Sequence, residues 1–476
     1  MTPGITIIPR LNMLTTEQCE AVHLASLEIL RRTGVRIYHD EALRLLNETD
    51  AVITDENLVR FPPGMIEWAC SQAPSRIALC KRGTDEVVVP LEAMQVNFGT
   101  GSDCLNYLDP YTGFHRRFTV DDLIKSVQLV DALPELDFCM SMGIPSDLEA
   151  TNTYRQQFAL MLENTSKPIV FVCDDLADCE TIVAMAAVPA GGIDALRINP
   201  TLLLYSEPTT PLQHSQTATA KLLYMAEQQI PIVHSPAPMM GGTAPMSLAG
   251  GLALGNAEVL SSLVLHQLKH PGAPFVYGQG LHHIDMKTTI SVYGAPEYQI
   301  ARVLVAEMGR YYGLPTWGYA GHSDSCTMDE QAAADSAFSV LIALLTGTNL
   351  VHDVGYLEAG LTTSPEMIVF TAEMIAMMRQ FTQGIPLDSE TLALEVIHQV
   401  GPGGEFMSND HTLRHYRDMW MPTLFSRQRL SEWSASGSLR LGQRLKDRTI
   451  SIMEAYNPQP LSDKTREEIS YILNQA

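Results

Sequence analysis

The sequence has few basic residues for its length. Its 476 residues contain 31 lysines and arginines against 54 aspartates and glutamates, so the formal net charge is -23 at pH 7. A surface this acidic repels phosphate backbones. We therefore expect no nucleic-acid partner, and the charge by itself predicts only a well-solvated surface.

Paired cysteines and long apolar runs are also missing. The eight cysteines are scattered without a CxxC pair, and disulfide frameworks belong to small secreted domains. The first residues, "MTPGITIIPRLNMLTTEQ", contain no basic stretch followed by an apolar one, and no window of about 18 residues is continuously apolar. We predict a cytoplasmic protein with reduced thiols and no membrane span.

Several catalytic motifs are absent. No GxGxxG follows the first predicted strand, and there is no P-loop, nucleophile elbow or H-E-x-x-H helix. His282 and His283 are adjacent, but no third ligand lies at a suitable spacing. We expect no bound metal, and these absences exclude the commonest dinucleotide, nucleotide and zinc-protease sites.

The N-terminal part shows helix and hairpin signals. Residues 15–33 predict a helix with a capping box at Thr15 and Gln18 and a C-terminal glycine, Gly34. Further helices are expected near 40–47 and 63–72, and "RIALCKRGTDEVVVP" is typical of a hairpin. These elements predict a small N-terminal α/β lobe over residues 1–93.

Short apolar runs alternate with helical patterns from residue 94 onwards, and this alternation predicts a parallel sheet. Eight such units over 94–383 fit a (β/α)8 TIM barrel, with an open doubly wound sheet as the alternative. Residues 384–476 are expected to form a C-terminal helical segment. The eight runs are "QVNFGTG" (95–101), "DFCMSMG" (137–143), "PIVFVCDD" (168–175), "TLLLYSEP" (201–208), "PIVHSPAP" (231–238), "PFVYGQG" (274–280), "TWGYAGHSD" (316–324) and "NLVHDVG" (349–355).

Aromatic residues are only 7% of the chain, yet five of the eight runs end with one at or near the tip. Active sites of such barrels lie at the carboxyl ends of the strands. Aromatic faces gathered there would bind a quaternary ammonium ion by cation–π attraction, worth about 0.5–2 kcal/mol for each contact. The alternative is that these large, half-polar side chains cap the barrel core.

Four blocks of sequence carry a resemblance to a known family. They are "LTTEQCEAVHLASLEILRRTGV" near the N-terminus, "GGTAPMSLAGGLALGNAEVLSSLVL" at 241–265, "YGQGLHHIDMKTTISVYGAPEY" at 277–298 and "GYAGHSDSCTMDEQAAADSA" at 318–337. In this order they resemble the trimethylamine methyltransferase (MttB) superfamily over nearly the whole chain. The resemblance implies a TIM barrel that moves a methyl group from a methylated amine to the cobalt of a separate corrinoid protein.

The founding members of that superfamily carry pyrrolysine, which this sequence lacks. The resemblance places the corresponding position at or beside His322, and it favours the non-pyrrolysine branch, of which glycine betaine:corrinoid methyltransferase is the best-known kind. A corrinoid protein is therefore the expected partner and cob(I)alamin the methyl acceptor, with no tightly bound cofactor. We expect catalytic roles for His322, Asp324 and Gln279, and substrate binding by Asn97, Phe98, Tyr205, Glu207, His234, Tyr277, Tyr319, His352 and Tyr356.

The expected reaction is demethylation of glycine betaine to dimethylglycine. The same residues would suit proline betaine, carnitine, γ-butyrobetaine or choline, and the sequence does not choose among them. Two other classes stay open, a zinc-dependent barrel methyltransferase and a non-enzymatic quaternary-amine binding protein. A homo-oligomer is expected from the resemblance and from the helical C-terminal segment, and the loop from His282 to Gly294 is expected to form part of the rim where the corrinoid protein docks.

Overall fold

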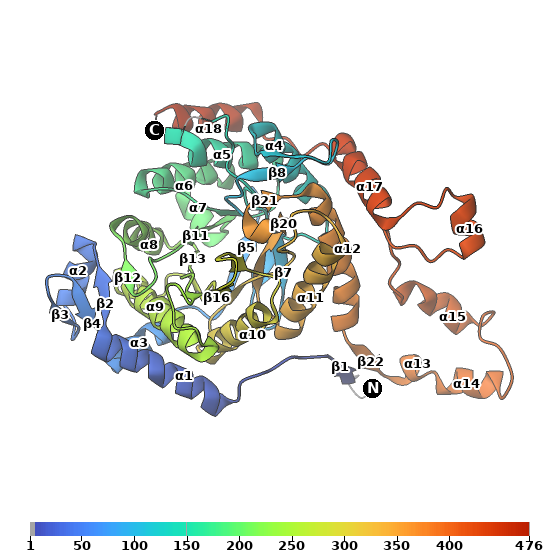
Figure 1. Ribbon diagram of the computed structural model, residues 1–476, viewed down its shortest axis with the longest axis horizontal. Coiled ribbons are helices and arrows are strands. Elements are labelled where there is room, and N and C mark those ends of the chain that lie inside the picture. Colours follow the sequence, from blue (N-terminus) through green and yellow to red (C-terminus); the bar gives the residue numbers. More distant parts are fainter. Residues whose placement is uncertain (1–4, 149, 476) are drawn as a thin grey trace.

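Eight short parallel segments lie at the centre of this computed structural model, which describes residues 5–148 and 150–475 (Figure 1). We call these segments the strand ring. They are β7 (Asn97–Thr100), residues 138 and 139, β10 (Ile169–Phe171), β11 (Leu202–Ser206), β13 (Ile232–His234), β15 (Phe275–Val276), β18 (Trp317–Tyr319) and β19 (Leu350–Val354). Each predicted run contains one of them, and the mixed α/β class is confirmed.

Parallel pairing connects the strand ring from one member to the next. β10, β11, β13 and β15 form one parallel sheet, and β18, β19 and β7 form another. Single parallel bridges join the two sheets. They are Gly99 to Phe138, Cys139 to Ile169, and Tyr277 to Thr316. Because all pairs are parallel, the carboxyl ends of the segments face the same side.

Helices surround the strand ring, as Figure 1 shows. They are α4 (Val120–Ala132), α5 (Thr153–Asn164), α6 (Leu176–Ala190), α7 (Ile193–Ile198), α8 (Gln216–Gln228), α9 (Leu248–Lys269), α10 (Pro296–Tyr311), α11 (Glu330–Thr346) and α12 (Pro365–Thr382). Within the described residues, α9 alone is long and apolar enough to cross a membrane, but 78% of its most apolar window is buried inside the protein. That burial is typical of a core helix.

Alternate residues of the ring point into its interior, as strand geometry requires. The interior cluster contains Val170, Leu203, Val233, Val276 and Trp317. The predicted hairpin is present as β5 (Ile77–Cys80) and β6 (Val87–Leu91), and its apolar side chains join the same cluster. Asn97 at the start of β7 donates to the carbonyl of Pro90 in this hairpin. The hairpin therefore covers the amino-terminal end of the ring and leaves the carboxyl end open.

The N-terminal helices and strands form largely where the sequence signals indicate. The capping box is present, since the Thr15 amide donates to Gln18 Oε1 at 2.8 Å and the Gln18 amide donates to Thr15 Oγ1 at 3.3 Å. The predicted helix 15–33 is α-helical only over α1 (Thr16–Glu28), and a π-helical turn (Ile29–Thr33) completes it before Gly34, which has φ 78°. The elements that follow are β2 (Val35–Ile37), α2 (Asp40–Asn47), β3 (Val52–Thr54), β4 (Leu58–Arg60) and α3 (Pro63–Gln72), and β12 (Gln213–His214) pairs with β2.

Two small sheets follow the carboxyl ends of ring strands. One joins β14 (Met239–Met240), β16 (His282–Ile284) and β17 (Ser291–Val292), so the predicted loop over 282–294 is partly strand. The other joins β8 (Asn106–Leu108), β9 (His115–Arg117), β20 (Tyr356–Leu357) and β21 (Thr362–Thr363). Short 3-10 turns occupy Ala150–Asn152, Glu358–Gly360 and Tyr416–Asp418.

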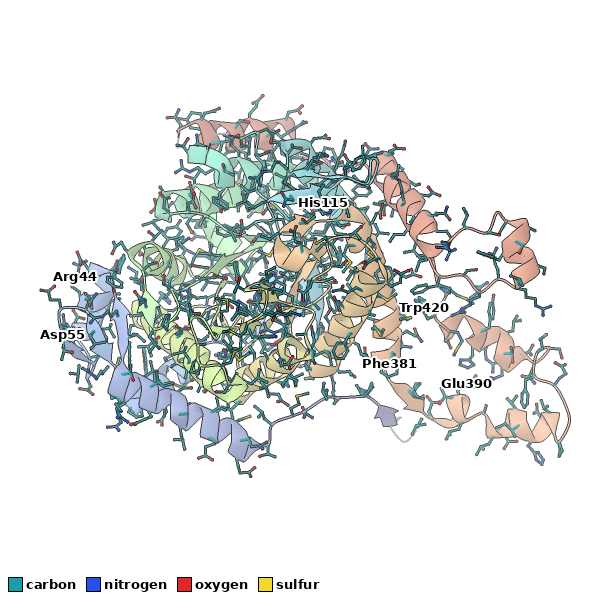
Figure 2. The ribbon with its side chains drawn as sticks, viewed as in Figure 1. Arg44, Asp55, His115, Phe381, Glu390 and Trp420 are labelled. Carbon is teal, nitrogen blue, oxygen red and sulfur yellow. The ribbon has the colours of Figure 1, made fainter. Side chains whose placement is uncertain are left out.

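Most of the chain between residues 385 and 440, a segment that we call the arm, projects from the body (Figure 1), and Leu424 within it is buried against the body. The arm contains β22 (Ile385–Leu387), which pairs with β1 (Ile5–Ile7), then α13 (Ser389–Leu392), α14 (Leu394–Val400), α15 (Asp410–His415) and α16 (Leu430–Ala435). Figure 2 shows Glu390 and Trp420 on it, away from the ring. α17 (Leu441–Ala455) then packs on α12 and α4, and α18 (Asp463–Gln475) packs on α5 and α6.

Candidate active site

A cavity of about 310 Å³ lies at the carboxyl ends of the strand ring. Its lining is rich in tyrosine and in carboxylates. Among the described residues that line it, none is a lysine or an arginine. The lining residues are Tyr205, Tyr293, Tyr298, Tyr319 and Tyr356, with Asp103, Glu207, Asp353, His282 and His352, and the smaller Ser102, Ala237, Gly280, Ala359, Gly360 and Leu361.

A bulge in β19 brings two adjacent side chains to the cavity. Val351 pairs with Phe98 of β7 and Val354 pairs with Thr100, so β19 has one residue more than its neighbour over this interval. The extra residue lets both His352 and Asp353 line the cavity, and Asp353 takes the left-handed φ of 80°.

Tyr205 and Glu207 form a coupled pair on one wall. Strand alternation directs Leu203, Tyr205 and Glu207 to the same side of β11, the first into the ring interior and the other two into the cavity. The Tyr205 hydroxyl donates to a Glu207 carboxylate oxygen. Burial within the fold raises the pKa of Glu207 to about 7, although this hydrogen bond opposes the shift. The Glu207 carboxylate faces the cavity, and protein surrounds that cavity. Because of these surroundings, the carboxyl group titrates near neutral pH.

Tyr293 and Tyr298 form a second wall, and two of the predicted residues, His322 and Asp324, contact it. The two tyrosine rings stack with centroids 5.0 Å apart, and the His322 ring lies edge-on to both, at 5.5 and 5.2 Å. Burial lowers the pKa of His322 to about 4, so it is neutral at pH 7. Asp324 accepts hydrogen bonds from the amides of Tyr293 (2.8 Å) and Gly294 (2.9 Å). These contacts fix the loop that presents Tyr293.

Arg302, which no sequence motif singles out, lies behind this wall. The Arg302 guanidinium lies 4.4 Å from the ring centre of Tyr298 and 4.6 Å from that of Tyr319. It donates to the main-chain carbonyls of Gln279, at 3.1 Å, and Leu281. Arg302 is thus a buried cation held by rings and carbonyls rather than by a carboxylate.

Five of the predicted substrate-binding residues line the cavity, and they come from three ring strands, β11, β18 and β19, or the segments directly after them. They are Tyr205, Glu207, Tyr319, His352 and Tyr356. The predicted catalytic residues do not line it: His322 is fully buried behind the Tyr293–Tyr298 pair, and Asp324 contacts the loop amides.

The other predicted residues lie away from the cavity, three of them because they point outwards from the ring. The Tyr277 hydroxyl donates to Asn256 Oδ1 of α9 at 2.7 Å, and Gln279 Nε2 donates to the Tyr277 hydroxyl at 3.3 Å. His234 is fully buried, with its ring centre 6.3 Å from that of His214.

Asn97 and Phe98 lie near the amino-terminal end of the ring. Asn97 Nδ2 donates to the carbonyls of Pro90 and Asn349, at 2.9 Å in each case. Phe98 is buried in the outer core, and the Arg379 guanidinium lies 5.6 Å from its ring centre. Both residues stand too early in β7 to reach the carboxyl end.

Asp103, Asp353, Tyr293 and Tyr298 line the cavity but were not among the predicted site residues. The two aspartates could have been predicted from their positions in the sequence, because each lies at or just after the end of a predicted run. The tyrosines belong to "YGAPEYQ", where the proline-containing turn signals the start of a helix after a loop. The loop over 282–294 is expected at the rim, but nothing in the sequence indicates that its last turn folds inwards to line the cavity.

A possible metal-ligand group lies elsewhere. In the described part of the chain, Glu390, His411 and His415 of the arm place ligand atoms within 4.8 Å of one another. Arg414 donates to the same Glu390 carboxylate at 2.8 Å, and Asp418 pairs with His415 at 2.7 Å. These side chains already satisfy one another as an exposed charge cluster.

The central fold and its aromatic, acidic cavity define an α/β protein that is suited to a small cationic ligand. The family described as Trimethylamine methyltransferase (MTTB) matches residues 3–475. The chain belongs to this family, and it is a methyltransferase.

Named relatives agree with this assignment. The chain is 32% identical to Trimethylamine methyltransferase MttB of Desulfitobacterium hafniense, with 96% of this chain and 92% of the relative covered. It is 28% identical to the Glycine betaine methyltransferase of the same species, with 98% of each covered. Among solved structures, the monomethylamine methyltransferase MtmB of Methanosarcina barkeri matches with a TM-score of 0.52 at 12% identity, covering 94% of this chain and 88% of that one. This last similarity concerns the fold alone.

Proposed function

We propose that the chain transfers a methyl group from a quaternary amine to Co(I) of a separate corrinoid protein. The observation that carries the proposal is the cavity at the carboxyl ends of the ring, lined by five tyrosines and three carboxylates and by no lysine or arginine among the described residues. Tyrosine faces and carboxylates both attract an ammonium group. The relatives named for trimethylamine and glycine betaine support an amine as donor, and the sequence resemblance supports the corrinoid acceptor.

The chemistry of a quaternary amine suits a site without a general acid. When the N–CH3 bond breaks, its electron pair stays on nitrogen and leaves a neutral tertiary amine. Co(I) donates two electrons to the new Co–C bond and becomes Co(III). No proton is needed, which agrees with a buried, neutral His322 whose pKa burial lowers to about 4 and with Tyr319, whose pKa burial raises to about 12.

The protein's part is then to hold and orient the methyl donor. Placing the N–CH3 bond in line with the incoming cobalt and excluding water can contribute several kcal/mol, roughly 7–11 at most. Because the positive charge disappears as the methyl leaves, very tight binding of the cation would stabilise the substrate more than the transition state. We therefore expect modest substrate affinity.

Residue roles follow from position. We propose that Tyr205, Tyr319, Tyr356 and His352 contact the substrate and that Glu207 balances the ammonium charge. His322 and Asp324 are proposed as positioning residues, since they contact the tyrosine wall rather than the cavity. Glycine betaine is the first donor to test, followed by proline betaine, carnitine and γ-butyrobetaine.

We also infer that the closed cycle of parallel pairs is a (β/α)8 TIM barrel over residues 94–383. The pairing of all eight ring members supports this, as does the fold similarity to MtmB. Residues 1–93 would form the N-terminal lobe and 384–476 the helical extension. We propose a cytoplasmic location, where Co(I) chemistry is compatible with reducing conditions.

A homo-oligomer is proposed from the surface of the arm. Leu394, Met407, Leu413 and Leu430 are 67, 89, 70 and 76% exposed there, and exposed apolar side chains in this density mark an interaction site. Light scattering of the full chain and of a Met407→Glu, Leu413→Glu variant tests this. A monomeric wild type would reject it.

The reaction itself is tested with the purified protein, chemically reduced cob(I)alamin and a panel of quaternary amines. Formation of methylcobalamin, followed by visible absorbance, is the expected result for at least one of them. A matched reaction without protein gives the background rate. If none of the amines yields methylcobalamin above that background, the proposed function is wrong even though the fold stands.

A further inference from the structure

The charges around the cavity are unbalanced. Asp103, Glu207 and Asp353 reach it from the ends of three different ring members, β7, β11 and β19. Among the described residues of the lining, no lysine or arginine accompanies them. Buried charges are ordinarily paired or hydrogen-bonded, because leaving water is costly. These three carboxylates therefore create a site of negative potential.

The partners of these carboxylates are hydroxyl and imidazole groups. Asp103 Oδ2 accepts from the Ser102 hydroxyl at 2.8 Å, and Glu207 accepts from the hydroxyl of Tyr205. Asp353 lies against two histidines, 2.8 Å from His352 Nδ1 and 3.6 Å from His322 Nδ1. His322 is fully buried, and burial lowers its pKa to about 4. Hydroxyls and a neutral imidazole solvate a carboxylate without cancelling its charge.

Two buried cations outside the lining, Arg302 and Lys221, are held by main-chain carbonyls. Arg302 donates to the carbonyls of Gln279 and Leu281. Lys221 Nζ donates to those of Cys173, at 2.5 Å, and Asp174, at 3.2 Å. Neither side chain forms a salt bridge with a described acidic residue. A ligand carboxylate that entered the cavity would therefore find no lysine or arginine to pair with among the described lining residues.

The polar atoms left open in the cavity are suited to a neutral group. No described residue accepts a hydrogen bond from the hydroxyl of Tyr293 or Tyr298. His352 Nδ1 lies beside Asp353, and the other ring nitrogen, Nε2, has no hydrogen-bond partner in the described part of the chain. Such groups can bond to a ligand hydroxyl or ester oxygen without a full charge. The aromatic faces of the same side chains can accept the ammonium head.

We propose that the preferred methyl donor is a quaternary ammonium cation that carries no anionic group, such as a quaternary amino alcohol or an ester of a betaine. This inference rests on the proposed function and narrows its substrate class. A zwitterionic betaine gains the same ammonium contacts, but its carboxylate is placed beside Asp103, Glu207 and Asp353, and it is repelled more strongly as these groups ionise with rising pH. A cation with a neutral tail gains the attraction and avoids that repulsion.

Glycine betaine and its methyl ester make the sharpest comparison, because they share a skeleton and differ in one negative charge. Choline is the stable third ligand. Binding is measured by calorimetry without corrinoid, and methylcobalamin formation is measured separately with cob(I)alamin. We expect the ester and choline to bind at least tenfold more tightly than glycine betaine and to show the larger kcat/KM.

If glycine betaine binds or reacts as well as its ester, this inference is wrong, while the proposal of methyl transfer from a quaternary amine still stands. Failure of all three, together with the other quaternary amines, rejects the proposed function itself.

Variants of the carboxylates test the cause of the preference. Asp103→Asn and Glu207→Gln keep side-chain size and remove charge, so the ratio of choline to betaine affinity is expected to fall several-fold in each. Glu20→Gln is the matched control, since Glu20 is exposed on α1 and outside the lining, and its ratio is expected to equal that of the wild type. Melting temperatures confirm that each variant is folded. A ratio that Asp103→Asn and Glu207→Gln both leave unchanged overturns the assignment.

Discussion

Substrate affinity should rise with pH because of Glu207. Burial raises its pKa from the usual range to about 7, and the hydrogen bond from Tyr205 opposes the shift. A quaternary nitrogen has no proton to lose, so any pH dependence of its binding belongs to the protein. With a pKa near 7 the ionised fraction of Glu207 is about one tenth at pH 6 and about nine tenths at pH 8.

The sign follows from charge. Ionised Glu207 attracts the cation and protonated Glu207 does not, so the Kd for a quaternary amine should fall as pH rises from 6 to 8. If binding needs the ionised form, the change is about tenfold, or ~1.4 kcal/mol. Burial also raises the pKa of Asp103, and that shift acts in the same direction. Burial lowers the pKa of His282, so this ring is neutral over most of the range.

Calorimetric titration with choline at several pH values measures the effect without interference from cobalt chemistry. Glu207→Gln should flatten the profile. Tyr205→Phe keeps the aromatic face but removes the donor that lowers the Glu207 pKa, so its profile should move to higher pH. A wild-type Kd that is constant between pH 6 and 8, or a Glu207→Gln profile identical to that of the wild type, would refute this reasoning.

Three further outcomes are expected. Asp324→Ala leaves two partly buried amides without their acceptor and releases Tyr293, so stability should drop by about 1–3 kcal/mol and KM should rise in steady-state assays. Glu373 accepts from the amides of Thr423 and Leu424, so Glu373→Ala should leave the ring intact while limited proteolysis cleaves the arm faster. His322 is buried with a pKa of about 4 against 6.5 for an ordinary histidine. As the pH falls, the unfolded chain therefore takes up a proton on this histidine before the folded protein does. Urea titrations should show the free energy of unfolding falling from about pH 6.5 towards pH 4, by up to roughly 3 kcal/mol from this residue.

Local signals in the sequence were sufficient for the elements and their order. All eight apolar runs became ring members, because a strand buried on both faces needs a nearly continuous apolar run whatever surrounds it. The capping box at Thr15 and the proline at the start of α3 likewise act within one turn of helix. Such signals depend on neighbours in sequence and can be recognised without the fold.

The tyrosine wall could not be predicted in the same way. Tyr293 lies in the loop after β17 and Tyr298 on α10, and they meet only because the loop folds back over the ring. Asp324 holds that loop from a different strand end, and Arg302 supports it through carbonyls. Each of these contacts joins residues that are separated along the sequence. Tertiary packing brings them together, so neighbouring residues carry no signal for them.

Strand parity separates two tyrosines that looked equivalent. In β11, Leu203 faces the ring interior, so Tyr205, two residues later, lies on the same side and faces the cavity. In the segment that begins with β15, Val276 faces inwards, so the next residue, Tyr277, faces outwards and contacts Asn256.

Tyr205→Ala should remove one cation–π contact worth about 0.5–2 kcal/mol and raise KM by about two- to thirtyfold. Tyr277→Phe should leave KM unchanged but lower the free energy of unfolding by about 1–3 kcal/mol, since the buried Asn256 oxygen loses its donor. Steady-state kinetics and urea unfolding of both variants test this, and a raised KM in Tyr277→Phe would show that the outward face also contributes to the site.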